Sequence, residues 1–372
     1  MYLALREMRF AKTRYVMIVT IMLLVSFLVL FVTGLAKGLA YANASSIKNM
    51  SASHFVMEQE SDHRFGRSQL TEADLSTARS VVGENNAAPL SIRMTTVTEK
   101  GSRLKSDVTL FAIDLKSWLA PKVVEGQNIT NDTQGQVVVD RKLKDGGIKI
   151  GSILVDQMTG TSLMVSGFIA NESYSHTPSV FMNEKDWLKM RALTPVGGQD
   201  SSAKLYNAIA LKAKESQLAH LRDELTDSEI ISKADTVSAV PGYKEEQGSL
   251  LMMIVFLYVI SGMVLAVFFY VITIQKTSQF GILKAIGAKT GYLARNVVGQ
   301  VLLLSVGSLT ISLGLVRVVY AVLPASMPFQ LNSSTLMLSC SLFIVTAVLG
   351  SLLSVYKVAR MNALDAIGRA AA

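Results

Sequence analysis

Four long uncharged apolar runs dominate the pattern of hydrophobic and polar positions along the chain. They cover residues 15–36, 247–275, 296–316 and 335–356. The third helix is expected to continue past Arg317 to residue 323, where Pro324 and Pro328 interrupt the chain. At about 1.5 Å per helical residue, the first run spans about 33 Å, which is enough to cross a bilayer. The pattern therefore predicts four transmembrane helices in a one-plus-three order.

The positions of lysine and arginine orient these helices. Of the 13 basic residues in or beside the apolar runs, 11 fall on one side if both termini are cytoplasmic, and only Lys37 and Arg317 fall outside. Residues 43–246 carry 23 Lys/Arg against 26 Asp/Glu, so the net charge of +8 comes from the membrane-flanking residues. A nucleic-acid-binding domain would carry its basic patch on the soluble part. The distribution therefore predicts a multi-pass protein of the cell membrane with no nucleic-acid partner.

The run boundaries divide the chain into expected segments. We expect a cytoplasmic N-terminus at 1–14, a first transmembrane helix with an outward extension at 15–42, an extracytoplasmic domain at 43–246 and a second transmembrane helix at 247–275. A cytoplasmic loop at 276–295, a third helix at 296–323, a short outer loop at 324–334, a fourth helix at 335–356 and a cytoplasmic tail at 357–372 follow. The first run also resembles a signal peptide with an A-x-A site at residues 40–42. Its apolar stretch exceeds the roughly 7–15 residues of a signal core, which favours an uncleaved anchor.

The central domain alternates between β-rich runs and helical patterns. Strands are expected at 91–98, 108–113, 136–140, 153–156, 163–169, 179–182 and 206–211. Helices are expected at 72–82, 184–193 and 215–225, with Thr71 and Asn183 as N-caps of the first two. The mixture predicts an α+β domain. Residues 41–50 and 225–249 are expected to form stalks, the second interrupted by Pro241 and Gly242, and passive linkers are the equal alternative.

Few side chains offer catalytic or metal-binding chemistry. Cys340 is the single cysteine, and the four histidines at 54, 63, 176 and 220 show no metal-ligand spacing. The nearest approach to a nucleotide-binding loop starts at Gly281, but it has one residue too many between its glycines and Ala288 separates Gly287 from the lysine. His176 lies beside two serines and is expected to be polar surface. The sequence therefore predicts no catalytic residue, no metal site and no cofactor in this chain.

The most specific motif follows the second apolar run. The segment Gln279-Phe280-Gly281-Ile282-Leu283-Lys284-Ala285-Ile286-Gly287-Ala288 resembles the cytoplasmic segment [EQ]-[FI]-G-[IV]-L-[KR]-A-[IL]-G-A of FtsX/MacB-type permeases of ABC transporters. The resemblance covers the whole chain and implies a separate ABC ATPase, which binds ATP and Mg and meets residues 280–288. Apolar side chains on a short helix suit a partner's groove, and the two glycines permit close approach and a sharp return. An amphipathic surface helix without a partner is the alternative.

Two weaker matches extend this resemblance. Residues 363–368 are similar to the family's P-L-x-A-[IL]-[RG] ending, with Asn362 in place of the usual proline. Residues 137–182 resemble the outer domain's pattern of strand, L-x-x-G-x-x-x-G, strand and V-x-G-[FI]. The stretch 172–178 and the opening 3–9 are most similar to a branch of Gram-positive permeases that includes the heme exporter HrtB. This narrower resemblance implies an HrtA-like ATPase, homodimerisation and heme as the first candidate substrate.

Candidate substrate-binding residues lie in or near the spans. Lys37 and Arg317 could attract anionic groups such as heme propionates or lipid phosphates, or simply snorkel to the interface. Methionine can ligate iron and adapts to varied apolar ligands, although packing is its ordinary role, and the candidates are Met22, Met252 and Met253. Tyr41 could line an entrance near the outer leaflet or belong to the stalk.

These observations together predict the permease subunit of an ATP-driven exporter, which moves an amphipathic substrate out of the membrane. Export of antimicrobial peptides or lipoproteins is an alternative within the family. FtsX-like activation of a cell-wall hydrolase is a second alternative, and a membrane-anchored sensor is the alternative from another class.

Overall fold

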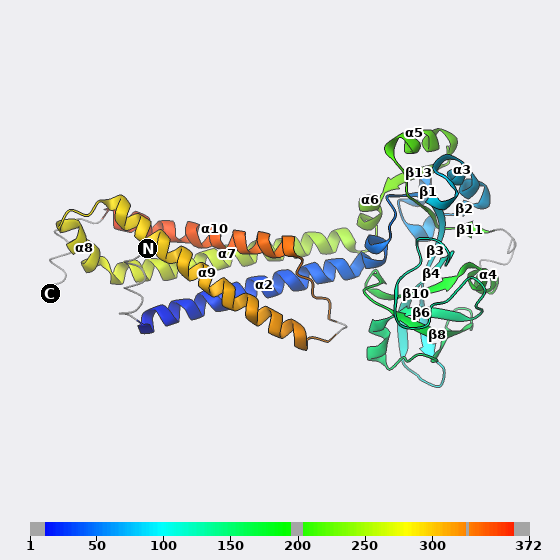
Figure 1. Cartoon of the computed structure of the whole chain (residues 1–372), viewed down its shortest axis with the longest axis horizontal. Coiled ribbons are helices and arrows are strands. Elements are labelled where there is room, and N and C mark those ends of the chain that lie inside the picture. The colour runs from blue at the N-terminus through cyan, green and yellow to red at the C-terminus, as the bar shows by residue number, and fades with distance from the viewer. Residues whose placement is uncertain (1–11, 195–203, 325–326, 361–372) are drawn as a thin grey trace. The chain divides into compact units, whose positions relative to one another are not determined.

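The computed structural model describes residues 12–194, 204–324 and 327–360, which belong to two compact units (Figure 1). Contacts group Met1–Gly38 with Gly248–Ala372 in a helical unit, and Leu39–Gln247 form an outer unit. The opening 3–9 and the motif at 363–368 lie outside the described residues, as does most of the two expected cytoplasmic termini.

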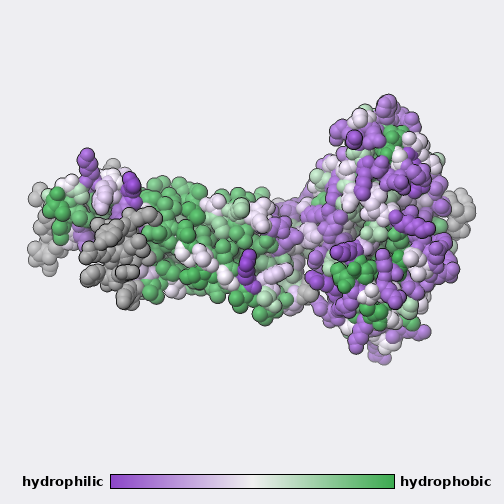
Figure 2. Space-filling model, viewed as in Figure 1, coloured by the Kyte–Doolittle hydropathy of each residue, from purple (hydrophilic) through white to green (hydrophobic). Residues whose placement is uncertain are grey.

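The described residues of the helical unit form four long helices and one short one. The long helices are α2 (Lys12–Asn49), α7 (Tyr243–Gln275), α9 (Thr290–Val322) and α10 (Ser333–Arg360), and the short helix is α8 (Thr277–Ala285). The four long helices are long and apolar enough to cross a membrane, which confirms the expected one-plus-three order. Hydrophobic side chains cover most of the visible face of this unit (Figure 2). α9 starts at Thr290, before the apolar run that begins at residue 296. Arg295 ends the uncharged run on that side, but a charged residue does not end a helix.

Two glycines of α2 seat the loop between α9 and α10. Gly34 and Gly38 are buried, and the N–H of Gln330 donates to the carbonyl of Gly34 (3.0 Å). A Cβ at Gly34 would lie 2.5 Å from the Phe329 ring, and one at Gly38 would meet the carbonyl group of Pro328. The loop can lie against α2 only because these positions lack side chains.

The described residues of the outer unit form an 11-stranded sheet and a separate two-stranded pair of β2 (Leu70–Thr71) and β11 (Leu205–Tyr206). Six strands of the large sheet pair in a closed ring in the order β3-β4-β10-β6-β8-β7 and back to β3. Their bounds are Ala87–Glu99, Lys105–Ile113, Thr177–Asn183, Gln136–Asp140, Ser162–Ile169 and Ile153–Asp156. Val97, Leu110 and Val165 are among the apolar side chains that fill this small barrel. β5 (Val123–Gly126) and β9 (Ser173–Tyr174) pair with β8 and β10.

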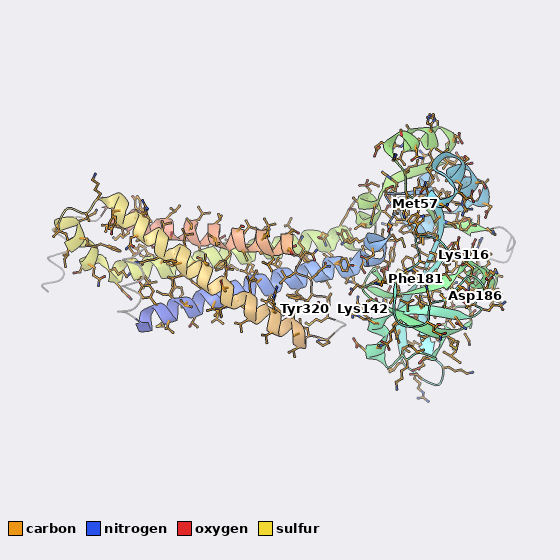
Figure 3. The ribbon with its side chains drawn as sticks, viewed as in Figure 1. Met57, Lys116, Lys142, Phe181, Asp186 and Tyr320 are labelled. Atoms are coloured by element: carbon orange, nitrogen blue, oxygen red, sulfur yellow. The ribbon has the colours of Figure 1, made fainter. Side chains whose placement is uncertain are left out.

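A second lobe extends from the first half of β3. β12 (Ala208–Leu211), β1 (His54–Glu58) and β13 (Ser228–Ser232) continue the sheet, and α3 (Glu72–Val82) and α5 (Glu215–Glu224) pack against it. α4 (Glu184–Ala192) follows β10, and α6 (Lys233–Ser238) follows β13. Figure 3 shows Met57 of β1 and Phe181 of β10, which are both fully buried in one shared core.

The local expectations for this unit agree closely with the structure. All seven expected strands and three expected helices are present, the α+β class is confirmed, and Thr71 and Asn183 cap α3 and α4 through Asp74 and Asp186. The expected strand 206–211 is split at Asn207, because its side chain accepts from the Ile92 N–H and its amide donates to two carbonyls. β1 and β13 were not predicted, and the expected second stalk consists of β13, the short helix α6 and, from Tyr243, the start of α7.

Candidate functional site

The segment 280–288 forms a helix with a sharply closed end. It contains most of α8, and Gly287 follows with a positive φ of 97°. The N–H of Ala288 donates to the carbonyl of Leu283 (2.9 Å), and the N–H of Gly287 donates to that of Lys284 (3.0 Å). This pair of hydrogen bonds is a Schellman arrangement, which needs the left-handed conformation that glycine adopts without steric cost. Gly287 therefore ends α8 and lets the chain turn into α9.

α8 buries one face and exposes the other. Ile282 and Ile286 are 52% and 77% exposed, and Ala285 between them is also exposed. Phe280 is only 2% exposed and packs with residues of α9 and α10, namely Leu293, Val297 and Val358. At 3.6 residues per turn, position 280 points away from positions 282 and 286. The sequence places Phe280 in a partner's groove, but the structure assigns it to this chain's own core.

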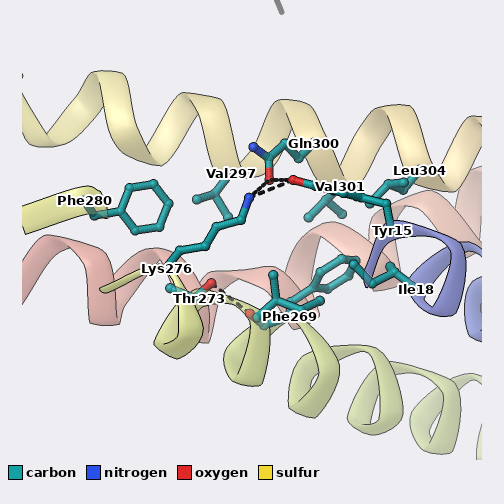
Figure 4. A pocket seen from close by; sticks show the side chains of 11 residues that line it. Tyr15, Ile18, Phe269, Thr273, Lys276, Phe280, Val297, Gln300, Val301 and Leu304 are labelled. Atoms are coloured by element: carbon teal, nitrogen blue, oxygen red, sulfur yellow. Dashed lines mark hydrogen bonds between the residues drawn. The ribbon is translucent and has the colours of Figure 1, made fainter. Parts of the chain in front are cut away.

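Two lysines fasten α8 to the long helices. The Lys284 ammonium donates to the carbonyl of Ala359 in the last turn of α10 (3.1 Å), where a cation also favours the helix dipole. Lys276 precedes α8 and is only 4% exposed. Its ammonium donates to the Tyr15 hydroxyl of α2 (2.7 Å) and to Gln300 Oε1 of α9 (3.3 Å), as Figure 4 shows. α8 is therefore held by side chains that reach three of the four long helices.

The burial of Lys276 is a feature that the sequence reasoning missed. We expected a membrane-flanking cation, yet this side chain lies inside the bundle beside Phe269 and Val301 (Figure 4). The apolar run that it ends has 29 residues, and about 20 suffice for a span. That excess length was the available signal. The cavity beside Lys276 measures about 20 Å³, which fits one water molecule and no organic substrate.

The candidate substrate-binding residues occupy separate places. Lys37 of α2 and Arg317 of α9 are both exposed, and no contact among the described residues joins them. Met22 is 1% exposed and packs in the core of the helical unit, whereas Met252 and Met253 are 61% and 43% exposed on α7. The Tyr41 hydroxyl donates to Asn49 Oδ1 (2.6 Å) within the outer unit, as expected of a stalk residue. Among the described residues of the helical unit, Met22 is therefore buried in the core, whereas Lys37, Arg317, Met252 and Met253 lie exposed on three different helices.

The stretch 172–178 forms a tight hairpin of the outer unit, surrounded by titratable groups. The N–H of Glu172 donates to Asp140 (2.7 Å), and the Lys142 ammonium, labelled in Figure 3, donates to the Ser173 hydroxyl (2.7 Å). Burial raises the pKa of Glu172 to about 7, which its hydrogen bonds with Asn49 and Ser46 only partly offset. Burial also raises the pKa of Asp140 and lowers that of Lys142.

Glu172→Gln is expected to stabilise the protein at pH 8 and to have little effect at pH 5. A carboxyl with a raised pKa in the folded state favours folding when protonated, and this contribution is lost as the pH rises from about 4.5 through 7. The difference is at most about 3 kcal/mol at 1.36 kcal/mol per pKa unit, and less with solvent screening. Thermal unfolding of the purified chain between pH 5 and 8 measures it. Glu60→Gln, at an exposed position, is the control, and parallel pH curves for wild type and Glu172→Gln would contradict the expectation.

Comparison with known proteins gives matches along the whole chain. Residues 251–363 match the family model described as the FtsX-like permease C-terminal. The chain is 30% identical over 368 residues to a hemin transport system permease protein, HrtB, of Staphylococcus haemolyticus, whose role is itself inferred, and the match covers 99% of each. An HrtB protein of Staphylococcus epidermidis, with the same inferred role, is 28% identical over 369 residues, again with 99% of each covered.

Two solved structures are similar to part of the chain. The extracellular domain of the noncanonical ABC-type transporter YknZ from Gram-positive bacteria is 15% identical, with a TM-score of 0.35, and covers 48% of this chain and 100% of that one. The periplasmic region of MacB from Actinobacillus actinomycetemcomitans is 11% identical, with a TM-score of 0.35, and covers 50% of this chain and 91% of that one.

Proposed function

Because the chain belongs to the family of HrtB hemin transport permeases, we propose that it is the permease subunit of an ATP-driven exporter and that its substrate is heme. The observation that carries this proposal is the match to a hemin transport permease over 99% of both chains. An ABC permease acts with an ATPase. ATP and Mg are therefore expected on an HrtA-like partner subunit, and both termini of this chain are expected in the cytoplasm beside it.

The proposed contact with the ATPase is the exposed face of α8, formed by Ile282, Ala285 and Ile286. A short helix that presents apolar side chains one turn apart suits a groove on a partner. The opposite face of α8 is packed against α9 and α10 through Phe280. Lys276 and Lys284 add hydrogen bonds to the long helices. A displacement of α8 by the ATPase is therefore expected to move the bundle and not only the loop.

Heme is a large apolar ring with two carboxylates and an iron atom, and it needs all three kinds of contact. Arg317 and Lys37 would attract the carboxylates, and the exposed thioethers of Met252 and Met253 are suitable iron ligands. A pocket for a ligand of this size measures hundreds of Å³, far more than the cavity beside Lys276. We therefore propose that two copies of the chain form a homodimer and that heme binds at a lipid-facing surface that the second copy completes.

Titration of hemin into the purified chain in detergent tests the substrate. We expect a saturable Soret band, with an affinity that falls about tenfold or more in Arg317→Ala, because a charge-assisted hydrogen bond contributes about 1.5–3 kcal/mol. Replacing Met252 and Met253 together by leucine is expected to shift the band itself, because iron loses a sulfur ligand. Met158→Leu is the matched control, since Met158 is an exposed methionine (55%) of the outer unit. An unsaturable or absent band would reject heme and favour peptide or lipoprotein export.

A further inference from the structure

One hairpin of the outer unit contacts both segments that lead to the transmembrane helices. It consists of β9, a two-residue turn and β10. The two segments are the end of α2, from Leu39 to Asn49, and the start of α7, from Tyr243 to Gln247, and both belong to the outer unit. β10 continues from the hairpin into the barrel, where it pairs with β4 and β6. We call this hairpin with Asn43 and Glu246 the clasp.

The end of α2 contacts the hairpin on both sides of a break in the helix at Ala44, which has φ −137° and ψ 25°. The carbonyl of Asn43 accepts from the N–H of Ser175 (2.7 Å). One residue beyond the break, Ser45 Oγ accepts from the N–H of Ser173 (2.8 Å). Ser46 and Ser179 share a hydrogen bond between their hydroxyls (2.7 Å). Three successive contacts therefore join α2 to both strands of the hairpin and to the turn between them.

The start of α7 is bonded to the same hairpin through one carboxylate. Glu246 Oε2 accepts from Nε2 of His176 (2.9 Å) and from the amide of Asn43 (2.5 Å). The Ser175 hydroxyl donates to the carbonyl of Pro241, just before α7 (3.4 Å). The Lys48 ammonium of α2 lies 4.8 Å from the centre of the Tyr243 ring of α7. Glu246 is thus the point where α2, α7 and the hairpin meet.

The two turn residues of the hairpin adopt a backbone conformation that glycine adopts most easily, although neither of them is glycine. Ser175 and His176 both have positive φ, 47° and 64°. Such a turn suits the twist of a hairpin, and Asn-Gly is its usual sequence. A non-glycine residue in the left-handed region costs about 1–2 kcal/mol and persists where its surroundings hold it. At His176, the hydrogen bond between its side chain and Glu246 offsets this cost.

We propose that the clasp joins the ends of α2 and α7 into one mechanical element and passes their displacement to the barrel through β10. His176 and Glu246 are positioning residues in this device. His176 fastens α7 to the hairpin, and Asn43 fastens α2 to the same carboxylate. The proposal rests on the proposed function only for its consequence in transport.

Hydrogen exchange on the full chain in detergent tests the clasp without reference to transport. In His176→Ala and in Glu246→Ala, we expect exchange about tenfold faster in residues 43–49 and 243–247, because one charge-assisted hydrogen bond is lost. Glu246→Ala removes the contact with Asn43 as well as the one with His176, so the double variant should exchange no faster than Glu246→Ala alone. Unchanged exchange in these segments, or fully additive effects, would overturn the clasp.

A second histidine of the outer unit supplies the matched control. His63 Nε2 bonds to Glu229 Oε2 at 3.0 Å, and His63 also has a positive φ, 57°. Its side chain is 42% exposed, against 43% for His176. His63→Ala therefore loses an equivalent contact away from α2 and α7. Equal acceleration of residues 43–49 and 243–247 in His63→Ala would show a general loosening and overturn the proposal.

The consequence for transport is a lower yield of substrate moved per ATP hydrolysed. His176→Ala is expected to retain ATPase association and ATP hydrolysis while export falls several-fold, because the helices move without the barrel. His176→Asn tolerates positive φ but reaches less far, so it separates the turn from the contact with Glu246. If both His176 variants export as much substrate per ATP hydrolysed as the wild type, although hydrogen exchange in residues 43–49 and 243–247 is faster, the mechanical role is overturned. If the wild type exports no heme but the variants show the expected changes in hydrogen exchange, the proposed substrate is rejected and the clasp is not.

Discussion

Aspartate in place of Ile286 is expected to abolish copurification of an HrtA-type ATPase with this permease. The Ile286 side chain is 77% exposed at the C-cap of α8, so the substitution should cost the isolated chain little stability. In the complex, the carboxylate would be buried against an apolar groove without a partner, at a cost of several kcal/mol. Since each 1.4 kcal/mol is about tenfold in affinity, a loss of more than about a hundredfold is expected. Affinity purification of the tagged permease from membranes containing both subunits measures it.

Two controls separate this contact from a general effect of charge. Ile286→Val keeps an apolar side chain and should retain the ATPase. Leu104→Asp places the same carboxylate at a residue of the outer unit that is 71% exposed, and it should also retain the ATPase. Ile282→Asp should act like Ile286→Asp, because the two side chains share one face of α8. Normal recovery of the ATPase with Ile286→Asp would reject α8 as the docking element and leave the family membership untouched.

Alanine in place of Gly38 is expected to destabilise the helical unit by about 2 kcal/mol. The added Cβ would lie 2.5 Å from the carbonyl carbon of Pro328 and 2.6 Å from Cα of Phe329. Both are backbone atoms, so no side-chain rotation relieves the contact, and overpacking of this kind costs about 1–3 kcal/mol or more. The better helix propensity of alanine offsets about 1 kcal/mol of this. Thermal unfolding in detergent, followed by the loss of monodisperse protein, measures the effect.

Other glycines of the unit provide a graded comparison. A Cβ at Gly314 of α9 meets nothing within 4 Å, so Gly314→Ala should be neutral or slightly stabilising. Gly34→Ala should be intermediate, since its nearest obstacle is the movable ring of Phe329. An equal melting temperature for Gly38→Ala and Gly314→Ala would show that the loop does not lie on α2. Gly34 and Gly38 have the G-x-x-x-G spacing of helix pairing, but here the chain's own loop occupies that groove.

The outer unit shows how far local signals reach. The β-rich runs and turn residues were sufficient to place seven strands between 91 and 211, because strand propensity and turn chemistry act within a few residues, but they did not mark β5 and β9. The strands β1 and β13 were not predicted. Their sequences, HFVME and SEIIS, are short and have polar ends, so they become recognisable as strands only when β12 pairs with β1 and β1 pairs with β13. The closure of the barrel by β7 depends on its pairing with β3 and β8, which no local pattern specifies.

The coupling segment shows the same division. The family motif and the glycines predict a short helix with a sharp end, and the structure has both. Which apolar side chain faces a partner depends on what the other face packs against. Val358 lies more than seventy positions from Phe280 in the sequence, yet it shares one cluster with that ring. The sequence likewise indicates only that Lys276 is a cation at the end of an apolar run. The hydrogen bonds to Tyr15 and Gln300 that it makes inside the bundle depend on the tertiary structure.

The sequence by itself determined the four spans, their one-plus-three order, the α+β class of the outer unit and the family. Hydropathy, turn chemistry and motifs are local properties that survive without neighbours. Only the tertiary structure decided which glycines seat a loop, which face of α8 is free and how α2 and α7 share Glu246. Asn43 and His176 lie 203 and 70 positions from Glu246, and no local signal spans such separations. Burial and hydrogen-bond partners depend on contacts between segments that are distant in the sequence, and these contacts exist only in the folded chain.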